Sequence, residues 1–179
     1  MSIVVVYESM FGNTRQVAEA IADGLGPYGP VTLVNVNDAS AKDAAESASL
    51  LVVGGPTHVH GMSRQTSRDE APSWANDPAK KLTLEPLAPG TGVREWIDGL
   101  DRVPPLFAAF DTRADIARLL SGAASGRIEH ELKARGSHAV LPGASFLVSK
   151  DTVLEDGELD RARDWAASVG KAAGIPITT

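Results

Sequence analysis

The sequence predicts an α/β protein in which a doubly wound, five-stranded parallel sheet has helices on both faces. Short runs of β-branched and aromatic residues without alternation, such as Ile3–Tyr7, are typical of strands that are buried on both faces. Amphipathic segments separate these runs, so that strands and helices alternate along the chain. With 179 residues, the chain is most simply one domain over 1–179.

Each element is predicted from its own pattern. Further strands are expected at Val31–Val36, Leu50–Val53, Leu106–Phe110 and His138–Leu141, the last of which can resume at Phe146–Val148. The first helix is expected on the apolar residues Val17, Ala18, Ile21, Ala22 and Leu25. The other helices are expected at Ala41–Ala48, at Val93, Trp96, Ile97 and Leu100, from Ile128 to near Gly136, and at Leu159, Ala162, Trp165, Ala166 and Val169. We expect Trp96 and Trp165 to lie in the core.

One connection, at about 63–91, interrupts this alternation. Its polar sequence contains Pro72, Pro78, Pro86 and Pro89. So long a connection in a compact domain is usually functional or disordered. Because it leaves from the edge of the sheet where ligands bind, we predict an insertion that is either a lid or a mobile segment. Arg64 and Arg68 at its root are expected to be solvated, and Trp74 is exposed in the pattern.

The composition limits the possible functions. The chain has no cysteine, which excludes disulfides, thiol redox chemistry and thiolate metal sites, so any redox role depends on a bound cofactor. The net charge of −6 argues against a nucleic-acid groove and favours neutral or basic partners. No segment resembles a transmembrane span, and the first strand directly follows Met1-Ser2, which leaves no room for a signal peptide. We therefore expect a cytoplasmic protein without membrane contact.

The segment Ser9-Met10-Phe11-Gly12-Asn13-Thr14 joins the first strand to the first helix. Hydroxyl groups, an amide and the free N–H groups of a helix N-terminus suit an anion, and a terminal phosphomonoester fits them well. The segment has neither the lysine and spacing of a nucleoside-triphosphate loop nor the G-x-G-x-x-G pattern of a dinucleotide loop. The alternative is that Ser9 or Asn13 only caps the helix.

Over nearly its whole length the chain resembles the flavodoxin-like family. Tyr7–Thr14 is similar to the family's FMN phosphate loop, and Gly54–Gly61 is similar to its second flavin loop. Phe110–Arg113 lies where the third loop begins, and Leu154–Leu159 resembles the acidic entry to the last helix. The resemblance implies the strand order 2-1-3-4-5 and FMN as the cofactor. It also implies flavin contacts from Ser9, Met10, Phe11, Gly12, Asn13, Thr14, Pro56, Thr57, His58, Val59, His60, Gly61, Asp111, Thr112 and Arg113.

The aromatic positions depart from the family pattern. Flavodoxins commonly hold the ring between a Trp or Tyr of the second loop and a Tyr of the third. Here the second loop offers His58 and His60, and the third has no tyrosine. His60 is expected to contact the ring and His58 to lie closer to its edge. Loss of the aromatic stack is expected to weaken FMN binding, unless Trp74 or the imidazoles replace it. Phe11 stands where many members have threonine. A metal site at the two histidines lacks a third ligand nearby in sequence.

Arg113 follows the fourth predicted strand. If its charge approaches the pyrimidine end of the flavin, it favours the anionic reduced form and raises the reduction potential. Replacement by glutamine is then expected to lower that potential. The alternative is a solvated loop arginine.

The resemblance implies a redox carrier without catalytic residues, in which FMN performs the chemistry. An acidic surface is expected to dock transiently with basic redox partners, and the protein is expected to be a monomer or a weak homo-oligomer. One alternative is an NAD(P)H-dependent FMN quinone or flavin reductase, with Arg64, Arg68 and Trp74 in a substrate pocket that a second subunit completes. Another is a binding module of this fold with an empty or weak flavin site.

Overall fold

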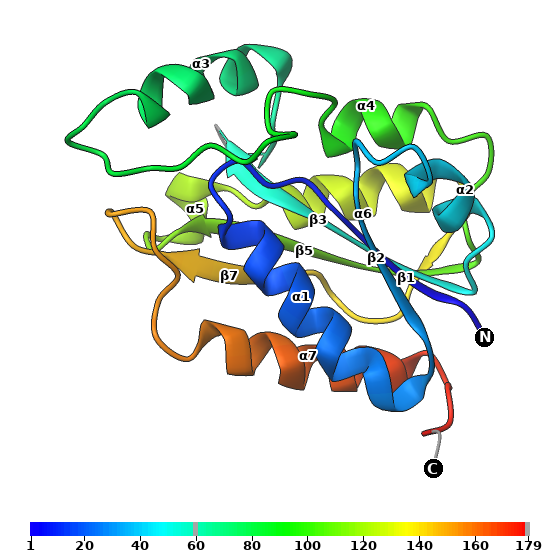
Figure 1. Cartoon of the computed structure of the whole chain (residues 1–179). Coiled ribbons are helices and arrows are strands. Elements are labelled where there is room, and N and C mark those ends of the chain that lie inside the picture. Colours follow the sequence, from blue (N-terminus) through cyan, green and yellow to red (C-terminus); the bar gives the residue numbers. More distant parts are fainter. Residues whose placement is uncertain (59–60, 178–179) are drawn as a thin grey trace.

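The computed structural model describes residues 1–58 and 61–177 (Figure 1). Strands in this part of the chain are β1 (Ile3–Tyr7), β2 (Val31–Asn35), β3 (Leu50–His58), β4 (Gly61–Met62), β5 (Leu106–Ala114), β6 (His138–Ala139) and β7 (Ala144–Val148). Helices are α1 (Asn13–Leu25), the 3-10 turn η1 (Gly26–Tyr28), α2 (Ala41–Glu46), α3 (Gln65–Ala75), α4 (Val93–Asp98), α5 (Arg118–Ser121), α6 (Ala124–Ala134) and α7 (Glu158–Ala172).

The sheet has the order β2-β1-β3-β5-β6, and these strands are parallel. This confirms the predicted fold class. The detail differs from five simple strands, because β6 and β7 share the last place and both pair with β5. Pro142 and Gly143 separate them, and a proline cannot donate to a strand ladder. In addition, the short β4 pairs antiparallel with the end of β3.

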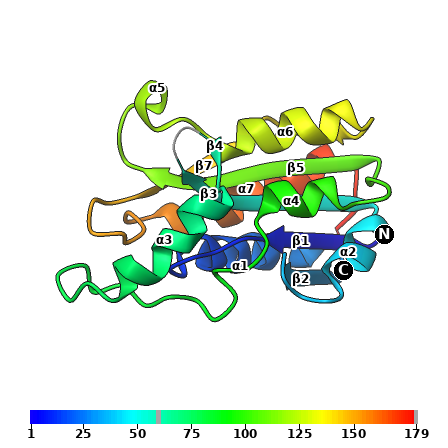
Figure 2. The ribbon, with the colours of Figure 1, turned by 90° about the horizontal axis from the view of Figure 1, so that it is seen from above.

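Alternate side chains of the strands enter two separate apolar layers. Val4 and Val6 pack under α2, α4 and α6, whereas Ile3 and Val5 pack against α1 and α7. Figure 2 shows α4 and α6 on one side of the sheet and α1 and α7 on the other. Burial of both faces explains why the strands read as continuous apolar runs. The two tryptophans predicted for the core pack in these layers, Trp96 in the first and Trp165 at the edge of the second.

The 63–91 segment is packed against the rest of the protein. It begins with α3, which lies at the carboxyl end of the strands (Figure 1). Ala71 and Ala88 are buried in a small apolar cluster with Met10, and Phe11 packs against that cluster. The sequence did not predict α3, because its interior contains Pro72 and it has no apolar stripe. Among the helices that the structure describes, none is both long and apolar enough to cross a membrane.

Candidate functional site

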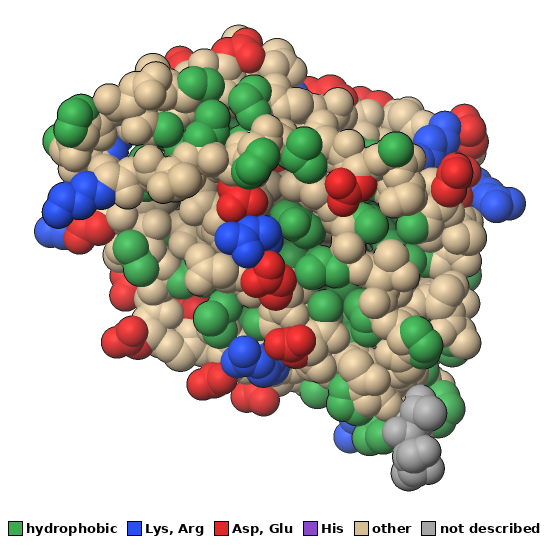
Figure 3. All heavy atoms as spheres, in the orientation of Figure 1, with side chains coloured by type: hydrophobic (Ala, Val, Ile, Leu, Met, Phe, Trp, Pro, Cys, Tyr) green, Lys and Arg blue, Asp and Glu red, His purple; other side chains and the backbone are tan. Residues whose placement is uncertain are grey.

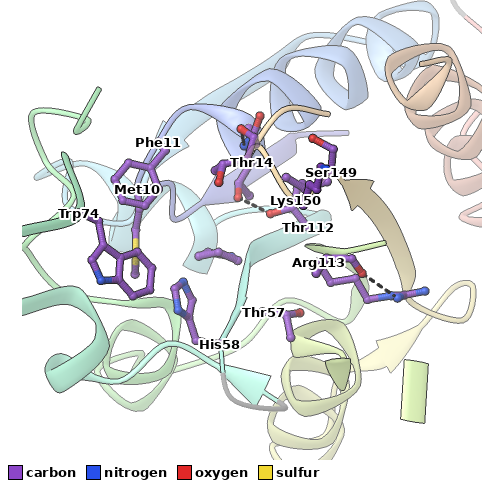
Figure 4. Close-up of a pocket in the computed structure, with 15 residues that line it drawn as sticks. Met10, Phe11, Thr14, Thr57, His58, Trp74, Thr112, Arg113, Ser149 and Lys150 are labelled. Atoms are coloured by element: carbon purple, nitrogen blue, oxygen red, sulfur yellow. Dashed lines mark hydrogen bonds between the residues drawn. The ribbon is translucent and has the colours of Figure 1, made fainter. Parts of the chain in front are cut away.

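A cavity of about 440 Å³ opens at the carboxyl edge of the sheet (Figure 4). Its walls come from the segments that follow β1 and β7, from the ends of β3 and β5 and from α3. The order reverses between β1 and β3, which is where open α/β sheets bind their ligands. The lining residues are Met10, Phe11, Asn13, Thr14, Pro56, Thr57, His58, Trp74, Thr112, Arg113, Ala114, Val148, Ser149, Lys150 and Thr152.

The loop between β1 and α1 offers hydrogen-bond donors to this cavity. Gly12 has a φ of 90°, and its N–H donates to Ser9 Oγ at 3.1 Å, so the Ser9 hydroxyl shapes the turn. Gly12 is also the N-cap of α1, and the described residues provide no side-chain cap for the amides of the first turn. Thr14 and Thr112 line the cavity with their hydroxyl oxygens 2.7 Å apart. Free amides, a hydroxyl and the helix dipole together favour a phosphate.

The end of β3 supplies a second wall. A Cβ atom at Gly54 would lie 2.2 Å from the Phe110 ring, so glycine is required for β3 to pass this side chain. Thr57 Oγ1 accepts a hydrogen bond from the N–H of Ala124 (2.9 Å), which ties the strand end to α6. His58 lines the cavity, and burial and the charge of Arg68 lower its pKa, which favours the neutral imidazole. Val59 and His60 lie outside the described residues.

Of the predicted site residues at the end of β5, two line the cavity and one does not. Thr112 and Arg113 line the cavity, whereas Asp111 is buried away from it and accepts a hydrogen bond from the N–H of Ser125 (2.9 Å). Burial raises the pKa of the Asp111 carboxyl. The Arg113 guanidinium donates to the carbonyl of Ile116 (2.8 Å) and to Ser121 Oγ (3.2 Å). The Arg113 guanidinium therefore forms hydrogen bonds with the segment after β5. The Asp111 carboxylate forms a hydrogen bond with the first turn of α6.

Two parts of the cavity wall are not among the flavin contacts that the resemblance implies. One is the turn after β7, where the carbonyl of Thr152 accepts a hydrogen bond from Asn13 Nδ2 at 2.8 Å. The other is the half-buried ring of Trp74 from α3, which faces the cavity in Figure 4. The turn after β7 was missed because the fifth predicted strand was placed mainly at His138–Leu141.

A buried ion cluster lies near the cavity. Arg68 is 0% exposed, and its guanidinium donates to Ser63 Oγ (2.8 Å) and lies 3.1 Å from Glu95 Oε2. The expectation that Arg68 is solvated is therefore wrong. Glu8 is buried in the same cluster, where its Oε2 accepts from the N–H of Val93 (2.9 Å). Burial raises the pKa of Glu8, and its hydrogen bonds and the Arg68 charge offset this only in part.

Replacing Glu8 with glutamine is expected to change how stability depends on pH. Because the pKa of Glu8 is higher in the folded than in the unfolded protein, the folded protein binds this proton more tightly. That contribution to stability is complete below about pH 4.5 and is lost as the pH rises through the raised pKa. In urea titrations, the free energy of unfolding of the wild type should fall relative to that of Glu8→Gln as the pH rises from about 4.5 through the raised pKa of Glu8. A difference that is independent of pH contradicts the prediction.

Comparison with known proteins decides the family. The family model described as Flavodoxin matches residues 5–95, which is just over half of the chain. The chain belongs to the flavodoxin family. Flavodoxin family proteins bind FMN, and FMN is the cofactor of this chain. Among proteins of curated function, none matches the sequence significantly.

Solved flavodoxin structures agree with this fold. A flavodoxin from the domain Archaea is 18% identical, with a TM-score of 0.64 over 97% of this chain and 99% of its own. The oxidised flavodoxin 1 of Bacillus cereus is also 18% identical, with a TM-score of 0.65 over 96% and 98% of the two chains. The flavodoxin, WrbA-like protein from Agrobacterium tumefaciens is 20% identical, with a TM-score of 0.58 over 97% of each chain. At these identities the similarity establishes the fold.

The residues at the cavity fit FMN. The uncapped N-terminus of α1 and the Thr14 hydroxyl match a phosphate. A Cβ atom at Gly12 would stand 3.3 Å from Glu85 Oε1, and the φ of 90° is strained for other residues, so this turn favours glycine. Met10, Phe11 and Trp74 give the cavity an apolar side that matches a flat ring system. Of the predicted contacts in the described residues, Ser9, Gly12, Gly61 and Asp111 are not in the cavity lining.

Proposed function

We propose that this flavodoxin family protein carries electrons between redox proteins with one FMN bound in the cavity. Bound FMN supplies one-electron and two-electron redox chemistry. In this proposal, the loop from Ser9 to Thr14 holds the phosphate, and Pro56–His58 with Thr112 and Arg113 flank the ring. A carrier needs no general base or nucleophile, because its residues only bind the flavin, orient it and limit its contact with water.

One observation gives this proposal its main support. The cavity lies at the β1–β3 edge, where the N-terminus of α1 and the ends of β3 and β5 converge. Polar donors gather beside α1 and apolar side chains beside α3, as the two ends of FMN require. The position and chemistry of the walls therefore match the whole cofactor, from phosphate to ring.

Partner binding is proposed to depend on the overall acidic charge. The net charge of −6 favours basic partners at low ionic strength. On the face shown in Figure 3, acidic and basic side chains are interspersed around hydrophobic ones. On this face the proposed attraction therefore comes from the net charge, and salt is expected to weaken it.

The reductase alternative requires Arg64, Arg68 and Trp74 to share a substrate pocket. In the described residues, Trp74 lines the cavity, whereas Arg68 is buried in the ion cluster and Arg64 is exposed. The two arginines therefore give the reductase no support, and the electron carrier is the function that we propose.

Stopped-flow kinetics tests the proposed function. The FMN-loaded protein is reduced chemically without oxygen and then mixed with oxidised cytochrome c, a basic one-electron acceptor. We expect rapid reoxidation of the flavin that slows as salt is added. Mixing the oxidised protein with NADPH alone should give slow reduction. Fast, repeated reduction by NADPH contradicts the carrier and supports the reductase.

A further inference from the structure

The 63–91 segment is fixed to the protein at two places. At its root, the fully buried Arg68 is held by Ser63 and Glu95. Near its far end, the N–H of Glu85 donates to the carbonyl of Met10 (2.8 Å), and Arg15 Nε lies 3.1 Å from both carboxylate oxygens of Glu85. This second attachment joins the segment directly to the phosphate loop and α1. Through Trp74 of α3, the attached segment contributes to the wall of the cavity.

The cavity wall is aromatic where this segment meets the loop between β1 and α1. The rings of Phe11 and Trp74 have centroids 6.3 Å apart and planes inclined by 22°. The two rings are stacked, and the long centroid separation means that they are offset, so Phe11 overlaps only part of the indole. Both line the cavity, and Figure 4 shows them beside Met10 on the side opposite Arg113. Together they form a broad apolar surface.

Trp74 lines the cavity and also contacts an exposed lysine. Lys80 Nζ lies 5.6 Å from the centroid of the Trp74 ring, and Lys80 is exposed and does not line the cavity. The lysine therefore covers one face of the indole, called the outer face here, in a cation–π contact. Trp74 shares the cavity lining with Phe11 and His58.

We propose that Trp74, adjoined by Phe11, is the aromatic residue against which the flavin ring packs in this protein. The inference rests on the proposed function and identifies how the same site holds the ring. A planar apolar ring gains both buried area and stacking energy on an indole face. In the part of the chain that the structure describes, the aromatic and imidazole rings that line the cavity are Phe11, His58 and Trp74, and Trp74 has the largest surface.

Substitutions at the two faces of one ring test this proposal. FMN and riboflavin are titrated into the apoprotein of the wild type, Trp74→Leu, Trp74→Phe and Lys80→Met. Trp74→Leu should raise the dissociation constants of both ligands by about tenfold, because both contain the flavin ring. Lys80→Met is the matched control at the outer face, and both dissociation constants should stay within about twofold of the wild type.

Flavin fluorescence provides a readout that does not depend on affinity. An indole in contact with the ring quenches flavin emission, whereas phenylalanine and leucine do not. Bound FMN should therefore be brighter in Trp74→Phe than in the wild type, even if Trp74→Leu fails to fold. Unchanged affinity in Trp74→Leu, or unchanged quenching in Trp74→Phe, overturns the role of Trp74 while FMN binding stands. If the wild type binds neither ligand, the proposed function itself fails.

Discussion

Replacing Arg68 with methionine is expected to lower the free energy of unfolding of the apoprotein by about 3 kcal/mol. The substitution leaves the carboxyl of Glu8 buried without its counter-charge and the hydroxyl of Ser63 without its donor. It also leaves a void beside Gly92, where a Cβ atom would stand 2.2 Å from Arg68 Nη1. The expected loss is at the lower end for a broken buried pair, because Glu95 is partly exposed and Glu8 can take up a proton. Urea unfolding at pH 7 measures it.

Three further variants show which property of Arg68 causes this loss of stability. Arg68→Lys keeps the charge but not the planar fork, so it should lose less stability than Arg68→Met. Arg64→Met changes the exposed neighbour and should stay within about 0.5 kcal/mol of the wild type. In the double variant with Glu8→Gln, the loss should be smaller than the sum of the two single losses. Simple additivity would mean that Arg68 and Glu8 do not interact.

The fold could be predicted from the sequence because its signals are local. The run Ile3–Tyr7 and the apolar stripe that ends at Leu25 each specify one element without knowledge of the rest. The ends of the strands were harder to predict from the sequence. The third and fourth predicted strands stop at Val53 and Phe110, yet β3 and β5 continue because Gly55 pairs with Asp111 and Pro56 with Thr112. Such pairing depends on a partner strand that is distant in sequence.

The candidate site could be predicted in part, for the same reason. Met10, Phe11, Asn13 and Thr14 are in the cavity lining because the strand-to-helix turn is local. The burial of Arg68 could not be predicted, since it depends on Glu8 and Glu95, which are remote along the chain. The place of Trp74 depends likewise on how the 63–91 segment folds back, through the contacts of Glu85 with Met10 and Arg15.

We expect the wild type to bind FMN on the order of 10³-fold more tightly than riboflavin, which lacks the phosphate. Hydrogen bonds to a charged group contribute about 1.5–3 kcal/mol each, and tenfold in affinity corresponds to about 1.4 kcal/mol. The uncapped first turn of α1 and the hydroxyl of Thr14 offer at least two such bonds. The partial positive charge at this helix end adds to them. Calorimetric titration of the apoprotein with each ligand measures the ratio.

The isosteric change Thr14→Val assigns this selectivity to the loop. It removes one donor to the phosphate without changing the ring site, so FMN affinity should fall by about tenfold or more while riboflavin affinity is unchanged. Thr112 then loses its hydroxyl partner, which lies 2.7 Å away. Thr112→Val removes the same contact from the ring side of the cavity, so any effect it has should be similar for FMN and riboflavin. The loop does not hold the phosphate if riboflavin binds as tightly as FMN. An equal loss of both ligands in Thr14→Val would mean that Thr14 acts on the ring or on the fold. The pattern expected here is the opposite of that for Trp74→Leu, so the two variants together locate the two ends of the cofactor.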